Sequence, residues 1–361
     1  MTGPLPPSLR TRARAAGSNA PGRFEQHGRE VVDDGWDLPE DPRLLRTEVR
    51  VEVPRSALVY NASPDLPFDR SVNPYRGCEH GCIYCYARPG HAFLGLSPGL
   101  DFETRLVARP GIGAVLDAEL RRKSYRVATI ALGTNTDPYQ PCDATHRVMR
   151  EVLEVLAAHR HPVAITTKGT LVERDIDLLA PMAADGLVAV GVSLTTLDAG
   201  LSRRMEPRAA APLRRLETMR RLAQAGIPVR AMIAPVVPGL TDQELEPLMQ
   251  AARDAGAVAA RSIALRLPLE VAPLFRDWLA THEPGRAAHV MNRVREMHGG
   301  RDYDPDFGRR MTGQGIWAEL LKRRFVVAAR RLGLDVPQPP LRCDLFRPPP
   351  RKGDQMDLFG D

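Results

Sequence analysis

Short aliphatic runs alternate with longer stretches of helical spacing through the middle of this chain, and this alternation restricts the fold more than any other feature. The expected strands are RVATIALG (126–133), PVAITTKG (162–169), LVAVGVSLTT (187–196), PVRAMIAPVV (228–237) and AVAARSIALRL (257–267). The expected helices are 143–158, 171–183, 209–225 and 241–255. Strands separated by helices of this length form a parallel sheet with right-handed crossovers. A further strand just before Cys78 completes six βα units, which predicts an α/β fold with an open barrel or a strongly curved sheet.

The segments on either side of this region have a different composition. Residues 1–45 are rich in Pro, Gly, Arg and polar residues without periodicity, so we expect a disordered leader. Residues 271–335 have helical spacing and predict a helical extension. Residues 336–361 are rich in proline and charge, which predicts a disordered tail. The α/β domain is then expected to cover 46–270.

Composition and signals favour a soluble protein. Hydrophobic residues make up 43% and charged residues 26% of the chain, and no apolar run approaches the ~20 residues of a membrane span. The basic N-terminus has no apolar core behind it, so it is not a secretory signal. We therefore expect a cytoplasmic protein whose cysteines stay reduced and act as ligands or reactive groups. The net charge of +6 is compatible with a nucleic-acid partner, but the charge alone favours an arginine-rich composition with scattered surface charge.

Three of the five cysteines lie within eight residues of one another, in the segment NPYRGCEHGCIYCYARP. They are Cys78, Cys82 and Cys85. Three thiolates in a C-x3-C-x2-C loop can hold three corners of a cubane cluster and leave the fourth iron open to a small molecule. A closed zinc site needs a fourth donor, which His80 or His91 could supply. The spacing therefore leaves both an iron–sulfur cluster and a zinc site open.

Small and polar residues follow each expected strand. Parallel strands bring their carboxyl ends to one edge of the sheet, where ligands collect in folds of this class. These strand ends are 133–137, 167–169, 193–195 and 235–239. The sequence thus predicts one pocket at that edge.

Tyr84, just before the last cysteine, and the position of the loop after the first strand add to this pattern. With them, residues 70–270 resemble the radical S-adenosylmethionine superfamily, which has a partial (β/α)6 barrel. The resemblance implies a single [4Fe-4S] cluster on the three cysteines and S-adenosylmethionine chelated at the open iron. The reduced cluster would pass one electron to the sulfonium and release a 5′-deoxyadenosyl radical, which abstracts hydrogen from a substrate. It also implies an electron donor of flavodoxin or ferredoxin type as a partner.

Within the superfamily, the sequence is similar to the spore photoproduct lyase-like group, whose members are often labelled DNA repair photolyases. The run CIYCYAR keeps that lyase's two tyrosines, here Tyr84 and Tyr86, and T-N-T-D-P matches its Asp-Pro run. Thr136 would touch the methionine moiety, and Ala234 would offer its backbone to the adenine. The implied cofactor-contacting residues are Tyr84, Thr136, Lys168, Ser193 and Ala234.

One position departs from the lyase. Where the lyase has its hydrogen-donating cysteine, this chain has Thr134, and a hydroxyl is a poor hydrogen-atom donor compared with a thiol. This argues against thymine-dimer reversal by the lyase's own pathway. Cys142 lies just beyond and either approaches the same pocket or is a small packed thiol. Cys142 and Tyr86 are the candidate catalytic residues.

Other polar residues near the strand ends have two interpretations each. Arg204 and Glu206 follow the fourth strand, and either pair with each other or clamp the methionine carboxylate or ribose of the cofactor. Asp137 either belongs to the pocket or caps a helix. Arg204 is included among the candidate cofactor-binding residues.

The C-terminal segment Gln355–Phe359, with the sequence QMDLF, resembles the pentapeptide by which bacterial polymerases and repair proteins dock on the DNA sliding clamp. Together these features predict a monomeric radical S-adenosylmethionine enzyme with an unknown substrate, for which nucleic acid is the leading hypothesis. The alternative is a non-catalytic, zinc- or iron–sulfur-containing nucleic-acid-binding protein. The polar strand ends favour the enzyme, since a binding module needs no cofactor pocket there.

Overall fold

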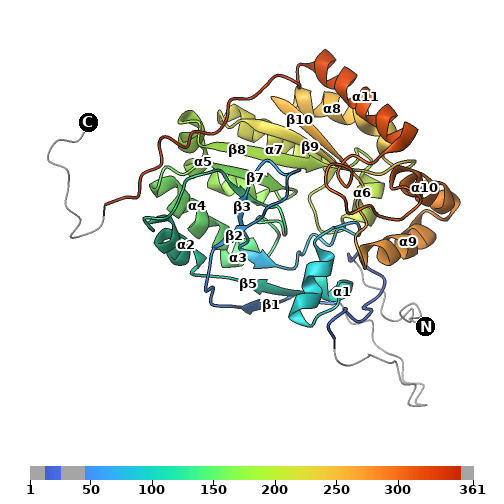
Figure 1. Ribbon diagram of the computed structural model, residues 1–361, viewed down its shortest axis with the longest axis horizontal. Coiled ribbons are helices and arrows are strands. Elements are labelled where there is room, and N and C mark those ends of the chain that lie inside the picture. Colours follow the sequence, from blue (N-terminus) through green and yellow to red (C-terminus); the bar gives the residue numbers. More distant parts are fainter. Residues whose placement is uncertain (1–12, 26–44, 351–361) are drawn as a thin grey trace.

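The main sheet of the protein has seven strands in the order β10-β9-β8-β7-β6-β3-β2 (Figure 1). The computed structural model describes residues 13–25 and 45–350. The strands are β2 (Leu58–Tyr60), β3 (Arg70–Val72), β6 (Ile130–Leu132), β7 (Val163–Thr167), β8 (Val188–Leu194), β9 (Val229–Val236) and β10 (Ala259–Ala264). The six strands from β3 to β10 pair in parallel, and β2 joins β3 antiparallel. This confirms the predicted α/β fold with six parallel strands in an open sheet.

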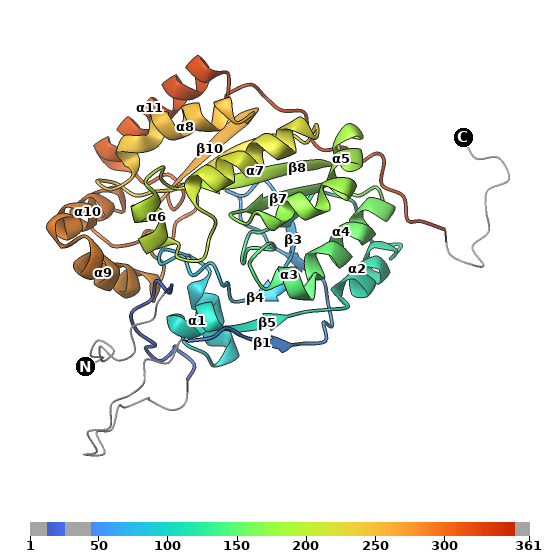
Figure 2. The same ribbon diagram turned by 180° about the vertical axis from the view of Figure 1, so that it is seen from behind.

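Helices connect the parallel strands and cover one face of the sheet, as Figure 2 shows for α4, α5 and α7. The helices up to β10 are α1 (Leu100–Thr104), α2 (Ile112–Leu120), α3 (Asp143–His146), α4 (Val148–Ala158), α5 (Ile176–Ala184), α6 (Ala199–Met205), α7 (Pro212–Gln224) and α8 (Leu245–Asp254). The expected helix 143–158 is broken at Arg147, whose φ of 51° is left-handed and interrupts the helical hydrogen bonds. After β10 follow α9 (Val271–His282), α10 (Pro284–Met297) and α11 (Gly315–Leu332), in the predicted helical extension.

A second, three-stranded sheet was not expected from the sequence. It has the order β1-β5-β4, with β1 (Glu48–Val51), β5 (Arg105–Ala108) and β4 (Tyr75–Arg76). Its strands are two to four residues long, too short to give a periodic sequence pattern. Because β4 ends two residues before Cys78, this sheet fixes where the cysteine loop begins.

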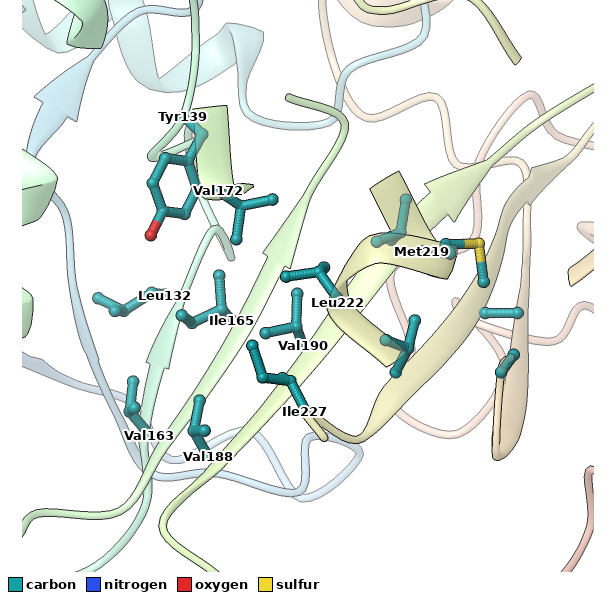
Figure 3. Close-up of a cluster of buried hydrophobic side chains, with 14 of the residues drawn as sticks. Leu132, Tyr139, Val163, Ile165, Val172, Val188, Val190, Met219, Leu222 and Ile227 are labelled. Atoms are coloured by element: carbon teal, nitrogen blue, oxygen red, sulfur yellow. The ribbon is translucent and has the colours of Figure 1, made fainter. Parts of the chain in front are cut away.

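The two faces of the main sheet carry different side chains. The outer face packs aliphatic residues against the helices, such as Ile165 and Val190 against Leu222 of α7 (Figure 3). The residues that alternate with these along β6, β7 and β8 point to the opposite face, which we call the inner face, and the pairing register places them side by side. They are mostly small or polar: Ala131, Ala164, Thr166, Ala189, Gly191 and Ser193. A Cβ on Gly191 would lie 3.0 Å from Met232 Cγ and 3.3 Å from Thr166 Oγ1, so the inner face is closely packed at this point.

Parts of both terminal segments pack on the domain, against the expectation of disorder. In the leader, Ala15 and Ala16 are buried, and Arg23 forms an ion pair of 2.7 Å with Glu270. In the tail, Phe346 packs among the rings of Tyr125, His159 and His161. The correction applies to 13–25 and to the tail up to residue 350. A composition rich in proline and glycine indicates a lack of periodic structure, not a lack of packing. The predicted clamp-binding segment Gln355–Phe359 lies outside the described residues.

No helix in the described ranges is long and apolar enough to cross a membrane.

We predict that His161 makes the fold less stable at mildly acid pH. Its Nε2 lies 2.7 Å from the Tyr125 hydroxyl and its Nδ1 2.9 Å from the Pro162 carbonyl, an arrangement suited to the neutral ring. Burial lowers the pKa of His161 to about 4. A lowered folded-state pKa gives stability that is present above the unfolded value of about 6.5 and is lost as pH falls towards 4. Between pH 7.5 and 5, His161 should cost about 2 kcal/mol of unfolding free energy.

Urea unfolding at the two pH values measures this loss. His161→Gln should shrink the difference between pH 7.5 and 5, and the same substitution at the exposed His289 should not. Equal pH dependence in both variants would contradict the assignment.

Candidate active site

The three cysteines lie on a tight loop between β4 and the 3-10 helix Arg88–Leu94. Two backbone turns shape the loop, from Gly81 N–H to the Cys78 carbonyl and from Cys85 N–H to the Cys82 carbonyl. The three thiols are free, with Cys78 and Cys82 buried and Cys85 partly buried. Burial raises the pKa of each thiol, while the positive charge of Lys168 acts in the opposite direction on Cys82 and Cys85. The loop therefore offers three unpaired sulfur donors next to a cation.

A buried ion pair between Arg88 and Glu103 supports the backbone of this loop. Arg88 is fully buried and lies 2.6 Å from Glu103, whose side chain is also fully buried. The same guanidinium donates to the carbonyls of Gly81 and Cys82 at 2.9 Å. Glu103 in turn accepts from the backbone N–H groups of the leader at Ala15 and Ala16. Arg88 therefore connects the cysteine loop to the packed leader, a role that the sequence did not suggest.

Two residues of the TNTDPYQ run attach the loop to the sheet. The buried Gln140 accepts from Glu79 N–H at 2.7 Å and donates to the Gly77 carbonyl at 3.3 Å, on either side of Cys78. Asp137 accepts from the Thr167 hydroxyl at 2.6 Å and from Lys168 N–H at 2.7 Å. Asp137 therefore ties the end of β6 to the end of β7 and caps no helix.

The two histidines of the loop region, His80 and His91, are buried beside other residues. His80 Nδ1 lies 3.3 Å from Asp137 Oδ2. Although burial alone would raise the pKa of Asp137, the charge of His80 and the hydrogen bonds from Thr167 and Lys168 lower it to about 2. His91 packs edge-on against Phe102, and burial lowers its pKa to about 4. In the part of the chain that the structure describes, no three His, Cys, Asp or Glu side chains gather as they would around a single metal ion.

Tyr84 closes the other side of the loop through a buried network. Its hydroxyl contacts Thr195 Oγ1 at 3.1 Å and donates to Glu206. Glu206 also accepts from Thr195 at 2.8 Å and pairs with the buried Arg215, which donates to the Ser193 carbonyl at 3.0 Å. Glu206 is thus a structural anchor for Tyr84 at the end of β8.

Of the two interpretations of Arg204, the pairing with Glu206 is wrong. Arg204 lies 2.6 Å from Glu283, at the start of α10, and its backbone carbonyl accepts from Trp278. Both partners come from the C-terminal helices, which the local sequence around Arg204 does not reveal.

The remaining predicted cofactor contacts lie at the carboxyl ends of their strands. Lys168 follows β7 with its Nζ 5.8 Å from the centre of the Tyr84 ring. Ser193 is buried on β8, and Ala234 on β9 accepts from Thr195 through its carbonyl at 3.3 Å. Thr136 is buried and donates to the Tyr75 carbonyl at 3.0 Å. Lys168 and Tyr84 thus lie close together beside the cysteine loop, at the edge of the sheet where the sequence predicts one pocket.

The two candidate catalytic residues lie in different surroundings. The Tyr86 hydroxyl donates to the carbonyl of Thr134 at the end of β6, and its ring is exposed. Cys142 precedes α3 and packs against the main core. Burial raises the pKa of the Cys142 thiol, followed in effect by the charges of Glu79 and Asp143. Its surroundings are those of a packed thiol.

Comparisons with known proteins give one family and one fold. The family model described as the radical SAM superfamily matches residues 72–252. An uncharacterized protein of Mycobacterium tuberculosis is 39% identical over 262 residues, which cover 72% of this chain and 76% of the relative. An uncharacterized protein of Methanocaldococcus jannaschii is 25% identical over 48% of this chain and 62% of its own length.

Solved structures of spore photoproduct lyase have a similar fold. The lyase complexed with dinucleoside spore photoproduct has a TM-score of 0.57 and 17% identity, with 79% of each chain covered. A mutant of the lyase with dinucleoside spore photoproduct has a TM-score of 0.55 at 16% identity, again with 79% of each chain covered.

Proposed function

The chain belongs to the radical SAM superfamily of enzymes, and on that premise we propose that its cysteine loop holds one [4Fe-4S] cluster with S-adenosylmethionine bound beside it. One observation carries this proposal. Three free, unpaired thiols lie on one tight loop next to Lys168, at the carboxyl ends of the parallel strands. When bound, the cluster and cofactor supply a 5′-deoxyadenosyl radical that abstracts a hydrogen atom from the substrate.

The donor set suits such a cluster. Cys78, Cys82 and Cys85 offer three sulfur ligands, which is one fewer than the four irons of a cubane. Backbone N–H groups of Ala87 and Arg88 favour the thiolate form of Cys85, which burial alone disfavours. Hydrogen bonds to the sulfurs are one of the means by which a protein tunes a cluster.

The surrounding residues would hold the cofactor. The Lys168 ammonium lies beside the loop and the Tyr84 ring, and it suits the methionine carboxylate. Ser193 and the Ala234 backbone would contact the rest of S-adenosylmethionine, with the Tyr84 ring as one wall. Arg204 is engaged with Glu283 and is less suited to the carboxylate than Lys168.

We further propose a nucleic-acid substrate and an electron donor of flavodoxin or ferredoxin type. The net charge of +6 and the likeness of the fold to a lyase that has been solved with a dinucleoside support the substrate class. The Tyr86 hydroxyl donates to the Thr134 carbonyl, and the exposed ring of Tyr86 on the cysteine loop would be available to a substrate. A threonine at position 134 makes a hydrogen-donating thiol at that position impossible.

Anaerobic reconstitution tests the proposal. The protein should bind about four irons per chain and, once reduced, form 5′-deoxyadenosine slowly from S-adenosylmethionine. Lys168→Ala should weaken cofactor binding on the order of tenfold, because a charged hydrogen bond to the carboxylate is removed. Iron content should stay unchanged, since Lys168 is no cluster ligand. Equilibrium dialysis with labelled cofactor and iron analysis measure the two quantities.

Lys322→Ala provides the matched control, because Lys322 is exposed on α11. Stoichiometric zinc without iron in the parent protein would overturn the cluster. Equal cofactor affinity in the parent and Lys168→Ala would show that the cofactor lies elsewhere.

A further inference from the structure

Two arginines project from the inner face of the sheet, where the other strands carry small residues. In the pairing register, Arg230 of β9 lies opposite Gly191 of β8, and Arg261 of β10 lies opposite Met232 of β9. Met232 in turn lies opposite Ser193. Paired residues of neighbouring parallel strands share a face, so Ser193 and Arg261 stand in one row, roughly 10 Å apart across two strand spacings. Arg261 is thus close to the proposed cofactor pocket.

A third arginine extends this line beyond the strand end. Arg266 follows β10 by two residues, and its guanidinium carbon lies 4.9 Å from the centre of the Tyr86 ring. On its other side it lies 6.0 Å from the ring of Tyr303, whose hydroxyl accepts from Nη2 at 3.3 Å. Two aromatic side chains from distant parts of the sequence therefore hold this cation beside the cysteine loop. We call Arg230, Arg261 and Arg266 the inner arginine row.

The inner arginine row has no negative partner. Among the residues that the structure describes, no carboxylate forms an ion pair with any of its three members. Nearby acids are already engaged, since Asp65 pairs with Arg310 at 2.6 Å and Asp304 with Arg309 at 3.2 Å. The Nε atoms of Arg230 and Arg266 are buried without a hydrogen-bond partner. Most other arginines near the site are paired, such as Arg88 with Glu103.

Such an arrangement is unfavourable for the protein alone. Burial lowers the pKa of Arg230, and the neighbouring charge of Arg261 lowers it further. Arg230 and Arg266 are partly buried cations without carboxylate partners, which costs stability, and the like charges of Arg230 and Arg261 on adjacent strands repel each other. Stability is commonly given up in this way at binding sites, where the ligand supplies the missing charge.

We propose that the inner arginine row binds the phosphates of a nucleic-acid strand and guides it along β9 and β10 to the radical site. This inference rests on the proposed function, whose substrate site it locates. Arg230 and Arg261 lie on the two strands at one end of the main sheet (Figure 1), and Arg261 is exposed, so its guanidinium is accessible to a nucleic-acid strand. The guanidinium fork suits phosphate, and the exposed Tyr86 ring next to Arg266 offers a stacking surface for a base.

An acidic peptide is the competing ligand. Carboxylates also pair with arginine, but stacking on Tyr86 and Tyr303 favours a ligand that has flat bases between its charges. Three cations without carboxylate partners likewise suit the repeated charges of a nucleic-acid backbone. The observations therefore favour nucleic acid.

The test is binding of a fluorescein-labelled 15-nucleotide single strand to the full-length reconstituted protein, followed by anisotropy at several salt concentrations. Replacing both Arg230 and Arg261 with methionine should weaken binding on the order of tenfold per arginine. The slope of log K against log salt should become shallower by about 1.4, or 0.7 for each phosphate of a single strand that is no longer neutralised. Arg266→Met should also weaken binding.

The matched control replaces Arg323 and Arg331, two exposed arginines of α11, with methionine and removes the same charge. Equal weakening in the control and the row variant would reduce the effect to net charge and overturn the proposal, as would a parent protein that does not bind the strand. Polyglutamate that competes as well as the oligonucleotide would overturn the assignment to nucleic acid.

Thermal unfolding of the variants gives a second test of the proposal that does not depend on the ligand. Arg230→Met should be at least as stable as the parent, because it removes an unpaired, half-buried charge. A clear fall in Tm would make Arg230 structural and contradict the proposal. Iron content and 5′-deoxyadenosine formation by the parent are measured in parallel, so a failure of the proposed function is seen separately from a failure of the arginine row.

Discussion

Replacing Cys82 with alanine is expected to lower the iron content of the reconstituted protein from about four per chain to near zero and to abolish cofactor cleavage. Cys82 is buried in the middle of the loop, and its backbone carbonyl accepts from Cys85 N–H and from Arg88. Alanine keeps these backbone contacts, so the loop should stay folded without the sulfur. Iron and sulfide analysis, together with the absorbance of the anaerobic protein, measures the effect. Cys78→Ala and Cys85→Ala should behave in the same way.

The other two cysteines provide the controls. Cys142 packs against the main core, and Cys343 lies in the C-terminal segment far along the chain from the loop. Alanine at either position should leave about four irons bound. A Cys82→Ala protein that keeps its full complement of iron would refute the assignment of the loop as the cluster site.

Replacing Arg88 with methionine is expected to lower the free energy of unfolding by about 3 to 5 kcal/mol. The substitution leaves Glu103 as a fully buried charge without its partner. It also removes the hydrogen bonds to the carbonyls of Gly81 and Cys82, which support the cysteine loop. Iron uptake should therefore fall together with stability. Urea unfolding of the iron-free protein measures the first effect, and reconstitution measures the second.

A double variant separates the buried charge from the other contacts. Adding Glu103→Gln to Arg88→Met should recover part of the missing stability, because no charge is then left buried. The exposed pair of Arg342 and Asp344 serves as the comparison, since Arg342→Met should lower the free energy of unfolding only slightly. An equal loss of unfolding free energy at the two pairs would show that burial does not increase the cost of breaking the Arg88–Glu103 pair.

The sequence predicted the parallel sheet well because each strand carries its own local signal. The run PVAITTKG contains β7, and LVAVGVSLTT contains β8, with aliphatic residues on the face that meets the helices. The strands are shorter than their runs, since an apolar run also includes buried loop residues. The sequence also predicted that the end of β7, with Lys168, lies at the edge where the pocket forms, because a parallel sheet brings strand ends to one edge.

The partners of charged side chains could not be predicted in this way. Glu206 faces Arg215 and Tyr84, while Arg204, two residues earlier, faces Glu283. Nothing in the local sequence distinguishes these two outcomes, because each depends on which distant segment packs there. The role of Gln140, which bonds to the loop on both sides of Cys78, could not be predicted either, because a single glutamine in a turn gives no sequence signal.

The sequence by itself determined the α/β class, the six parallel strands and the three-cysteine loop, since these depend on periodicity and spacing within short stretches. The tertiary structure alone decided that the leader packs under the loop through Glu103, that a small second sheet holds β4, and that three arginines stand without carboxylate partners near the site. Hydrogen bonds and ion pairs between segments far apart in sequence depend on relative position in space. Local sequence sets the conformation of each segment, but only the packed chain determines which segments meet.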